Sequence, residues 1–127
     1  MPVNYTDAVK TARMTATRDH FANGSLEIQA ADNTVLAIFG LSASGGTIAT
    51  DTWTLVFDNS TVTGETAAGT GGTVATQARV RTASPGQAND LTGLTVGTSA
   101  TDIILDNVNI ASGQNVTLTS ATIQHAT

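Results

Sequence analysis

The chain has 127 residues, enough for one domain with a buried core, and a net charge of −5. Only five residues are basic, which argues against direct binding to nucleic acid or to an anionic membrane surface, because both need clustered Lys and Arg. The absence of cysteine excludes disulfide scaffolds and thiolate metal sites.

Residues 5–24 contain the one clear helical pattern. Thr6 is a suitable N-cap, Asp7 follows in the first turn, and Asn23-Gly24 ends the helix. Apolar side chains at helical spacing form a narrow stripe: Tyr5, Ala8, Val9, Ala12 and Ala16. Because this stripe is too shallow for a free-standing helix, we expect it to pack on the sheet of its own chain or on a neighbouring subunit.

After Gly24 the hydrophobic period changes to two, which indicates strands. Residues 25–39 predict a hairpin with its turn at 31–33, in which Leu26 and Ile28 share one face and Glu27 and Gln29 the other. The segment 42–46, "SASGG", predicts a break in the chain.

A strand at 52–57 follows a second break near Asp51, and its Trp53, Leu55 and Phe57 should point inward together. Residues 58–72 are rich in Gly, Thr and Ala, and Val62 is their only large apolar residue, so they predict a long exposed loop.

Short strands with turn signals between them continue to the end of the chain. Alternation resumes at 73–82, and residues 83–90 form a loop around Pro85-Gly86. Later short strands are expected at 91–96, 102–106, 108–110 and 116–123. This spacing predicts a single, mainly β domain, with an N-terminal arm and helix at 1–24 and an antiparallel β-sandwich or barrel of about seven to nine short strands at 25–127.

The paired carboxylates Asp102 and Asp106 lie on either side of a short apolar run, where a chemical site could form. On a strand, a spacing of four places them about 13 Å apart, too far to share a proton or one metal ion. They are better explained as the polar ends of a short buried strand. The alternative is a Ca²⁺ site at Asp106, Asn107 and Asn109, because Ca²⁺ takes closely spaced oxygen ligands from one loop.

Other chemistry-bearing residues lack a convincing pattern. His20 and His125 lie at opposite ends of the chain, and the Gly-rich segments 44–46 and 69–73 lead neither into a helix nor into a Lys-Ser/Thr pair. Arg79 and Arg81 share one face of a predicted strand, which is typical of a solvated surface, although they could bind a carboxylate of a partner protein. The sequence therefore predicts no catalytic, cofactor or metal residues and no enzyme.

Two long stretches resemble a known family. "YTDAVKTARMTATRDHFANGSLEIQAADNTVLAIFGLS" (5–42) and "LTGLTVGTSATDIILDNVNIASGQNVTLTSATIQHA" (91–126) resemble the opening and the ending of small proteins encoded among the structural genes of tailed bacteriophages. Ala100 stands where that family often has Gly. The resemblance implies a virion component and carries no functional residues to this chain.

The resulting expectation is a non-enzymatic phage protein located in the virion, most simply a capsid decoration or cement protein on the outer face of the major capsid shell. Tail, neck or fibre association is the alternative, and a carbohydrate-binding adhesion module is disfavoured because Trp53 is predicted to point inward. A homo-oligomer, with a trimer favoured, is expected. The residues expected to contact the major capsid protein or another virion protein are Tyr5, Val9, Lys10 and Arg13.

Overall fold

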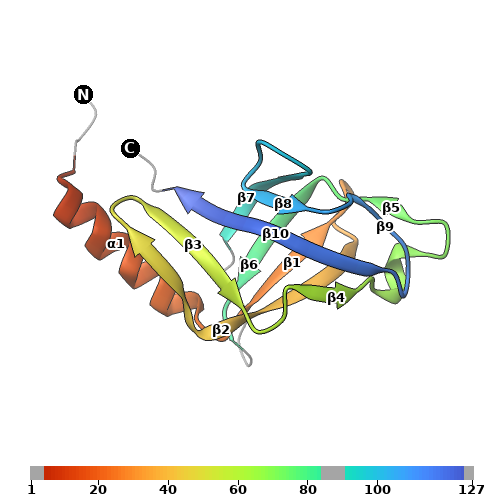
Figure 1. Ribbon diagram of the computed structural model, residues 1–127, viewed down its shortest axis with the longest axis horizontal. Coiled ribbons are helices and arrows are strands. Elements are labelled where there is room, and N and C mark those ends of the chain that lie inside the picture. Colours follow the sequence, from red (N-terminus) through yellow and green to blue (C-terminus); the bar gives the residue numbers. More distant parts are fainter. Residues whose placement is uncertain (1–4, 84–90, 125–127) are drawn as a thin grey trace.

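A computed structural model describes residues 5–83 and 91–124. In this part of the chain one α-helix precedes ten strands (Figure 1). The elements are α1 (Asp7–Phe21), β1 (Ser25–Gln29), β2 (Val35–Ala49), β3 (Thr52–Phe57), β4 (Thr61–Thr63), the 3₁₀-helix η1 (Thr66–Ala68), β5 (Thr73–Val74), β6 (Gln77–Arg81), β7 (Leu91–Gly97), β8 (Ile103–Leu105), β9 (Asn109–Ile110) and β10 (Asn115–Gln124).

Seven of the strands close into a barrel. They are hydrogen-bonded in the order β3-β2-β1-β6-β7-β8-β10, and β10 pairs again with β3. β4 adds to β10 outside this ring, and β5 pairs with β9. The expectation of a mainly β fold after one helix is therefore confirmed, and of the two predicted forms the barrel is the one observed. Its strand pairs are antiparallel except for β7 and β8, which run parallel.

The barrel is filled by apolar side chains that alternate along the strands. Leu26 pairs with Phe39 on one side and with Val80 on the other, so all three face the interior at the same level. The largest fully buried side chains are Trp53, Phe39, Leu26, Ile28, Leu36, Leu41, Ile103, Leu105, Ile110, Val80 and Val116. Trp53 and Leu55 point inward as predicted, and Phe57 is half-buried.

The predicted break at 42–46 is wrong, because β2 continues through it as a bent strand. The register between β2 and β3 shifts between Leu41 and Gly46, and Gly45 and Gly46 both have positive φ angles. The indole N–H of Trp53 donates a 2.9 Å hydrogen bond to the carbonyl oxygen of Gly45. The glycines thus bend a continuous strand at a bulge rather than ending it.

The segment 58–72 is exposed over most of its length, as its composition predicts, but it is not a continuous loop, because it contains β4 and η1. β4 pairs with β10, and η1 buries the Ala68 side chain, which is 3% exposed. The amide of Gly64 donates to the carbonyl oxygen of Gln114 at 2.7 Å. Small residues are needed here because a Cβ at Gly64 would collide with the backbone of Ala111.

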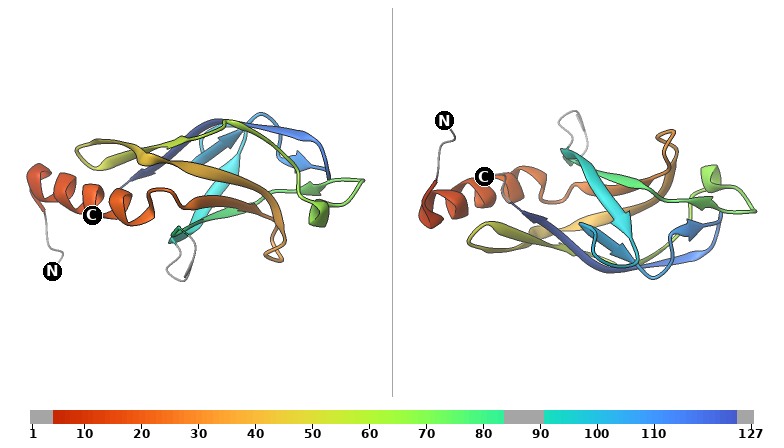
Figure 2. Two further views of the ribbon diagram at one scale, coloured as in Figure 1. Left: turned by 90° about the horizontal axis from the view of Figure 1, so that it is seen from below. Right: turned by 90° about the horizontal axis from the view of Figure 1, so that it is seen from above.

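The helix begins and ends where the sequence predicts. The Thr6 hydroxyl accepts a hydrogen bond from the Val9 amide, and the chain leaves the helix through Asn23, which has a positive φ angle. Figure 2 shows α1 at one end of the long axis of the molecule, with β5 and β9 at the opposite end. The predicted loop at 83–90 lies almost entirely outside the described residues.

Candidate functional site

The helix packs on the barrel through a face other than the predicted apolar stripe. Met14 and Phe21 are its buried residues, and the Phe21 ring stacks on Trp53 with a centroid distance of 6.3 Å. Thr11 donates to the carbonyl oxygen of Thr50, which anchors the helix to the β2–β3 turn. The helix therefore packs on its own barrel, which is one of the two expected alternatives, but it does so through Met14 and Phe21 and not through the predicted stripe.

The stripe instead faces away from the barrel. Its residues Ala8, Val9, Ala12 and Ala16 are all exposed, and the Val9 side chain is 40% exposed. Val9 and Arg13 are four residues apart, so they lie along one line of the helix surface, and Tyr5 precedes the helix, where its ring is in contact with Arg13. Together with Lys10, which is half-buried and lies nearer the barrel because it precedes the buried Met14 by four residues, they form what we call the outer helix face.

Within the outer helix face, the Arg13 guanidinium lies 4.6 Å from the centre of the Tyr5 ring. This cation–π contact holds both side chains against the helix rather than extended into solvent. In the described part of the chain neither Lys10 nor Arg13 has a carboxylate within salt-bridge distance, whereas Arg18 pairs with Asp19 at 3.1 Å. Tyr5, Val9 and Arg13 are thus brought together, whereas Lys10 lies at the edge of this face, toward the barrel.

A second feature lies on the outside of the barrel, where β1, β6 and β7 adjoin. It is a hollow of about 370 Å³, which we call the polar hollow. Its lining residues are Gln29, Asn33, Gln77, Ala78, Arg79, Thr92 and Gly93. Gly93 has a positive φ angle at a bulge of β7, where Thr92 and Gly93 both lie opposite Arg79, and this bulge widens the outer surface beside β6.

Arg79 and Arg81 are not the solvated pair that their spacing suggests. Arg79 is paired directly with Glu27 across β1 and β6, and its guanidinium donates to one carboxylate oxygen at 2.7 Å. Arg81 lies 3.5 Å from the other oxygen of Glu27. Glu27 is 7% exposed, so the two arginines cover a carboxylate that would otherwise be buried without a counter-charge.

Next along β1, Gln29 is 5% exposed although it lies on the outer surface of the barrel. It is the direct cross-strand partner of Gln77. The Gln77 amide nitrogen donates to the carbonyl oxygen of Ala30 at 3.0 Å and to Oδ1 of Asn33 at 2.7 Å. Among the described residues, the side-chain amide of Gln29 has no hydrogen-bond partner, and such a buried orphan costs about 1–3 kcal/mol.

The sequence placed Glu27 and Gln29 correctly on one face of a strand but gave no sign that this face is covered. Alternation shows which residues share a face, and burial depends on the neighbouring strand. The polar hollow was therefore missed. The available signal was the run of long polar side chains, Gln77, Arg79 and Arg81, on the strand that pairs with β1.

Asp102 and Asp106 occupy the ends of β8, as predicted. Asp102 accepts hydrogen bonds from the amide and hydroxyl of Thr95, and Asp106 accepts one from the Thr117 amide. The side chain of Asn107 accepts a hydrogen bond from the amide of Asn109. The side-chain oxygens of Asp102 and Asp106 thus form hydrogen bonds to neighbouring strands, and that of Asn107 stabilises a turn.

No group of three or more His, Cys, Asp and Glu side chains that could hold a metal ion is found within residues 5–83 and 91–124. His20 is exposed at the end of α1, where its ring meets Phe21 edge-on, and His125 lies outside the described residues. In the described chain, α1 is neither long nor apolar enough to cross a membrane.

Comparison with known proteins adds no relative. No family model matches the chain, and neither a curated protein nor a solved structure matches it.

Proposed function

We propose that this protein is a non-enzymatic structural subunit of a tailed-phage virion and that it binds the outer face of the capsid as a decoration protein. The resemblance of residues 5–42 and 91–126 to phage structural proteins supports the virion assignment. The observation that carries the contact is the outer helix face, which the barrel leaves uncovered at one end of the molecule (Figure 1).

Charge and shape favour an acidic partner surface. Of the five basic residues, Arg79 and Arg81 are engaged by Glu27 and Arg18 by Asp19, which leaves Lys10 and Arg13 to pair with carboxylates of a partner. Val9 supplies apolar area beside them. An interface of this composition matches the pattern of an apolar centre with a charged rim.

The size of the surface supports a multivalent assembly. A helix of 15 residues offers one face roughly 22 Å long and 10 Å wide, on the order of 200 Å², whereas a stable interface buries about 800 Å² per partner. A single copy therefore binds weakly. A homo-oligomer, with a trimer our preferred form, gains avidity by engaging several capsid subunits at once.

The tail remains the alternative location. A tail ring assembled by pairing free strand edges is disfavoured, because the barrel closes on itself and the outermost strand of its sheet, β4, has only three residues.

The test is a sedimentation assay in which the purified protein is mixed with intact phage heads and, separately, with isolated tails. We expect saturable binding to heads in many copies, and strong loss of it for Val9→Asp. The aspartate lies in the first turns of α1, where the helix dipole favours it, so the helix should persist. Val56→Asp is the matched control, because Val56 is 43% exposed on β3.

Binding to tails alone would transfer the protein to the neck or tail, and binding to neither would overturn the proposal. Equal binding of the Val9→Asp and Val56→Asp variants would remove the outer helix face from the interface. Deleting the whole helix is a poor test, since Met14 and Phe21 belong to the core and their loss would expose Trp53.

A further inference from the structure

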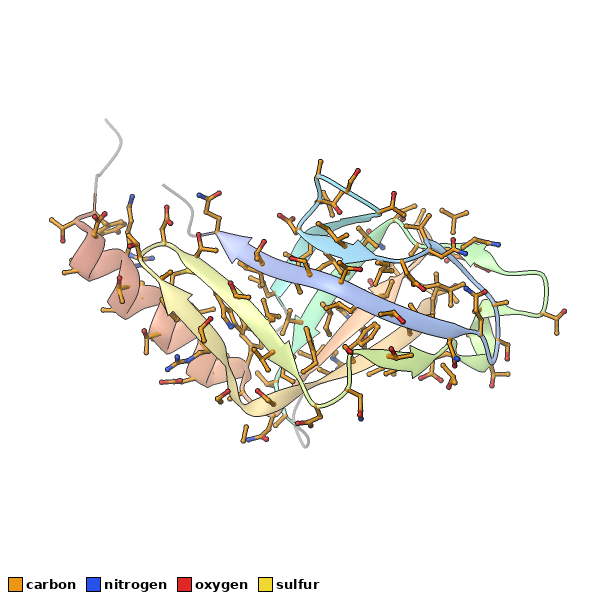
Figure 3. All side chains as sticks on the ribbon, in the orientation of Figure 1. Atoms are coloured by element: carbon orange, nitrogen blue, oxygen red, sulfur yellow. The ribbon has the colours of Figure 1, made fainter. Side chains whose placement is uncertain are left out.

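We propose that the polar hollow binds a neutral saccharide, a single sugar ring or a disaccharide, through its side-chain amides. This inference does not rest on the capsid role, because the hollow is formed by β1, β6 and β7 and shares no residue with the outer helix face. Figure 3 shows these strands with their side chains.

The burial of Gln29 is the first reason to expect a ligand in the hollow. Buried polar side chains are almost always hydrogen-bonded, and each exception needs an explanation. Gln29 is 95% buried, given its exposed fraction of 5%, it lines the hollow, and its amide lacks a partner in the described structure. A ligand hydroxyl in the hollow would complete both its donor and its acceptor sites.

The groups beside Gln29 offer both hydrogen-bond donors and acceptors to a ligand. The nitrogen of Gln77 is used internally, which leaves its carbonyl oxygen as an acceptor, and Asn33 conversely uses its oxygen and keeps its N–H groups. The hydroxyl of the exposed Thr92 can both donate and accept. Such a mixture of donors and acceptors matches sugar hydroxyls, because each hydroxyl can both donate and accept a hydrogen bond.

The charge and polarity of the described lining residues disfavour other classes of ligand. Arg79 is held by Glu27, so the hollow has little net positive charge to attract a phosphate. Both oxygens of Glu27 face arginines, which argues against a metal ion. Among the described residues, Ala78 and Gly93 are the only apolar ones that line the hollow, which disfavours a lipid or aromatic ligand.

A peptide is disfavoured by the topology. Peptides that recognise backbone groups commonly add a strand to an open sheet edge. β1 pairs with β2 and β6, and β6 also pairs with β7, so both strands that carry the amides are already paired on each side. Only the outward side chains are available, which suits a compact ligand seated on the sheet.

The volume of about 370 Å³ lies at the small end of ligand pockets. Gly93 contributes to it, since a side chain there would point into open space beside the bulge and its positive φ angle disfavours other residues. Trp53, whose side chain could have formed a stacking platform, is fully buried. Binding therefore depends on hydrogen bonds alone and should be weak at a single site.

The experiment is an NMR titration of the isotope-labelled full chain with the methyl glycosides of glucose, galactose, mannose and N-acetylglucosamine. Inorganic phosphate and trialanine serve as competing ligand classes. We expect saturable shifts of the Gln29 and Gln77 side-chain amides and of the Thr92 backbone amide with at least one glycoside, and none with phosphate or trialanine.

The decisive variant is Gln29→Met, which has a similar shape without the amide. We expect it to weaken glycoside binding at least tenfold and to keep or raise the melting temperature, because a buried unsatisfied group is removed. If Gln29 served only to stabilise the fold, the substitution would instead lower the melting temperature. Gln124→Met, on the exposed end of β10, should change neither property, and Thr92→Val offers a second binding variant at an exposed position.

The proposal is overturned if no glycoside gives a saturable response, or if only phosphate or only the tripeptide does. It is also overturned if Gln29→Met and Thr92→Val both bind the glycoside as the wild type does, or if Gln29→Met lowers the melting temperature without weakening binding.

Discussion

Replacing Glu27 with glutamine should destabilise the barrel, because it removes the carboxylate that pairs with both Arg79 and Arg81 on a covered face of β1. Removing one partner of a buried ion pair costs about 3–5 kcal/mol. The side chain of Glu27 is 9% exposed, but those of Arg79 and Arg81 are 28% and 24% exposed and are partly screened by water. We therefore expect a loss of about 2–3 kcal/mol, equivalent to a fall in melting temperature of roughly 10 °C.

Urea unfolding followed by tryptophan fluorescence measures this loss directly, since Trp53 is the single tryptophan and is fully buried. Glu65→Gln is the control, because Glu65 is half-buried and forms no salt bridge within the described residues. If the two variants unfold at the same urea concentration, the Glu27 pairs contribute nothing measurable and the argument from burial fails.

Two further predictions concern the helix and the first hairpin. Phe21→Ala removes the ring that stacks on Trp53 and should cost about 3–5 kcal/mol, with a red-shifted native fluorescence; an unshifted spectrum would mean that the helix does not cover Trp53. Hydrogen bonds from the Thr34 side chain and then its amide lower the pKa of Asp32, so its contribution to stability is present above the usual pKa and is lost as the pH falls through the lowered one. Thr34→Val should raise the NMR titration midpoint of Asp32, and an unchanged midpoint would contradict the assignment.

Local signals in the sequence predicted the fold class and several of its details. The cap at Thr6, the stop at Asn23-Gly24 and the hairpin at 25–39 each depend on residues close together in the chain. The prediction that Trp53 and Leu55 point inward is also confirmed. These features need no knowledge of distant neighbours, which is why composition and period are sufficient for them.

The failures have a common physical origin in contacts between distant segments. Gly45 and Gly46 predict a break in the chain, but the hydrogen bond from the Trp53 indole and the pairing with β3 hold them in a bulge of a continuous strand. Residues 58–72 read as a loop because their side chains are small, and small side chains are what the approach of Gly64 to Ala111 requires. Composition alone does not show where such a segment is held by contacts with distant residues.

The helix illustrates the same point for the candidate contact surface. Its buried face depends on two large residues, Met14 and Phe21, whereas the predicted stripe of smaller apolar residues is more regular but faces outward. The regular spacing correctly identified one apolar face of the helix. The face that packs on the barrel is the one with Met14 and Phe21, because a phenyl ring and a thioether bury more apolar area than alanines do. The remaining apolar face is what makes the helix a candidate for contact with another chain.

The order of the elements along the chain also separates the two proposed surfaces. α1 leads into β1 at Ser25, whereas Gln29 and the polar hollow lie at the other end of that strand. A partner bound to the outer helix face would therefore leave the hollow open, and a saccharide in the hollow would not displace that partner. Because the surfaces share no residue, the Val9→Asp and Gln29→Met effects should be additive, and failure of either proposal leaves the evidence for the other unchanged.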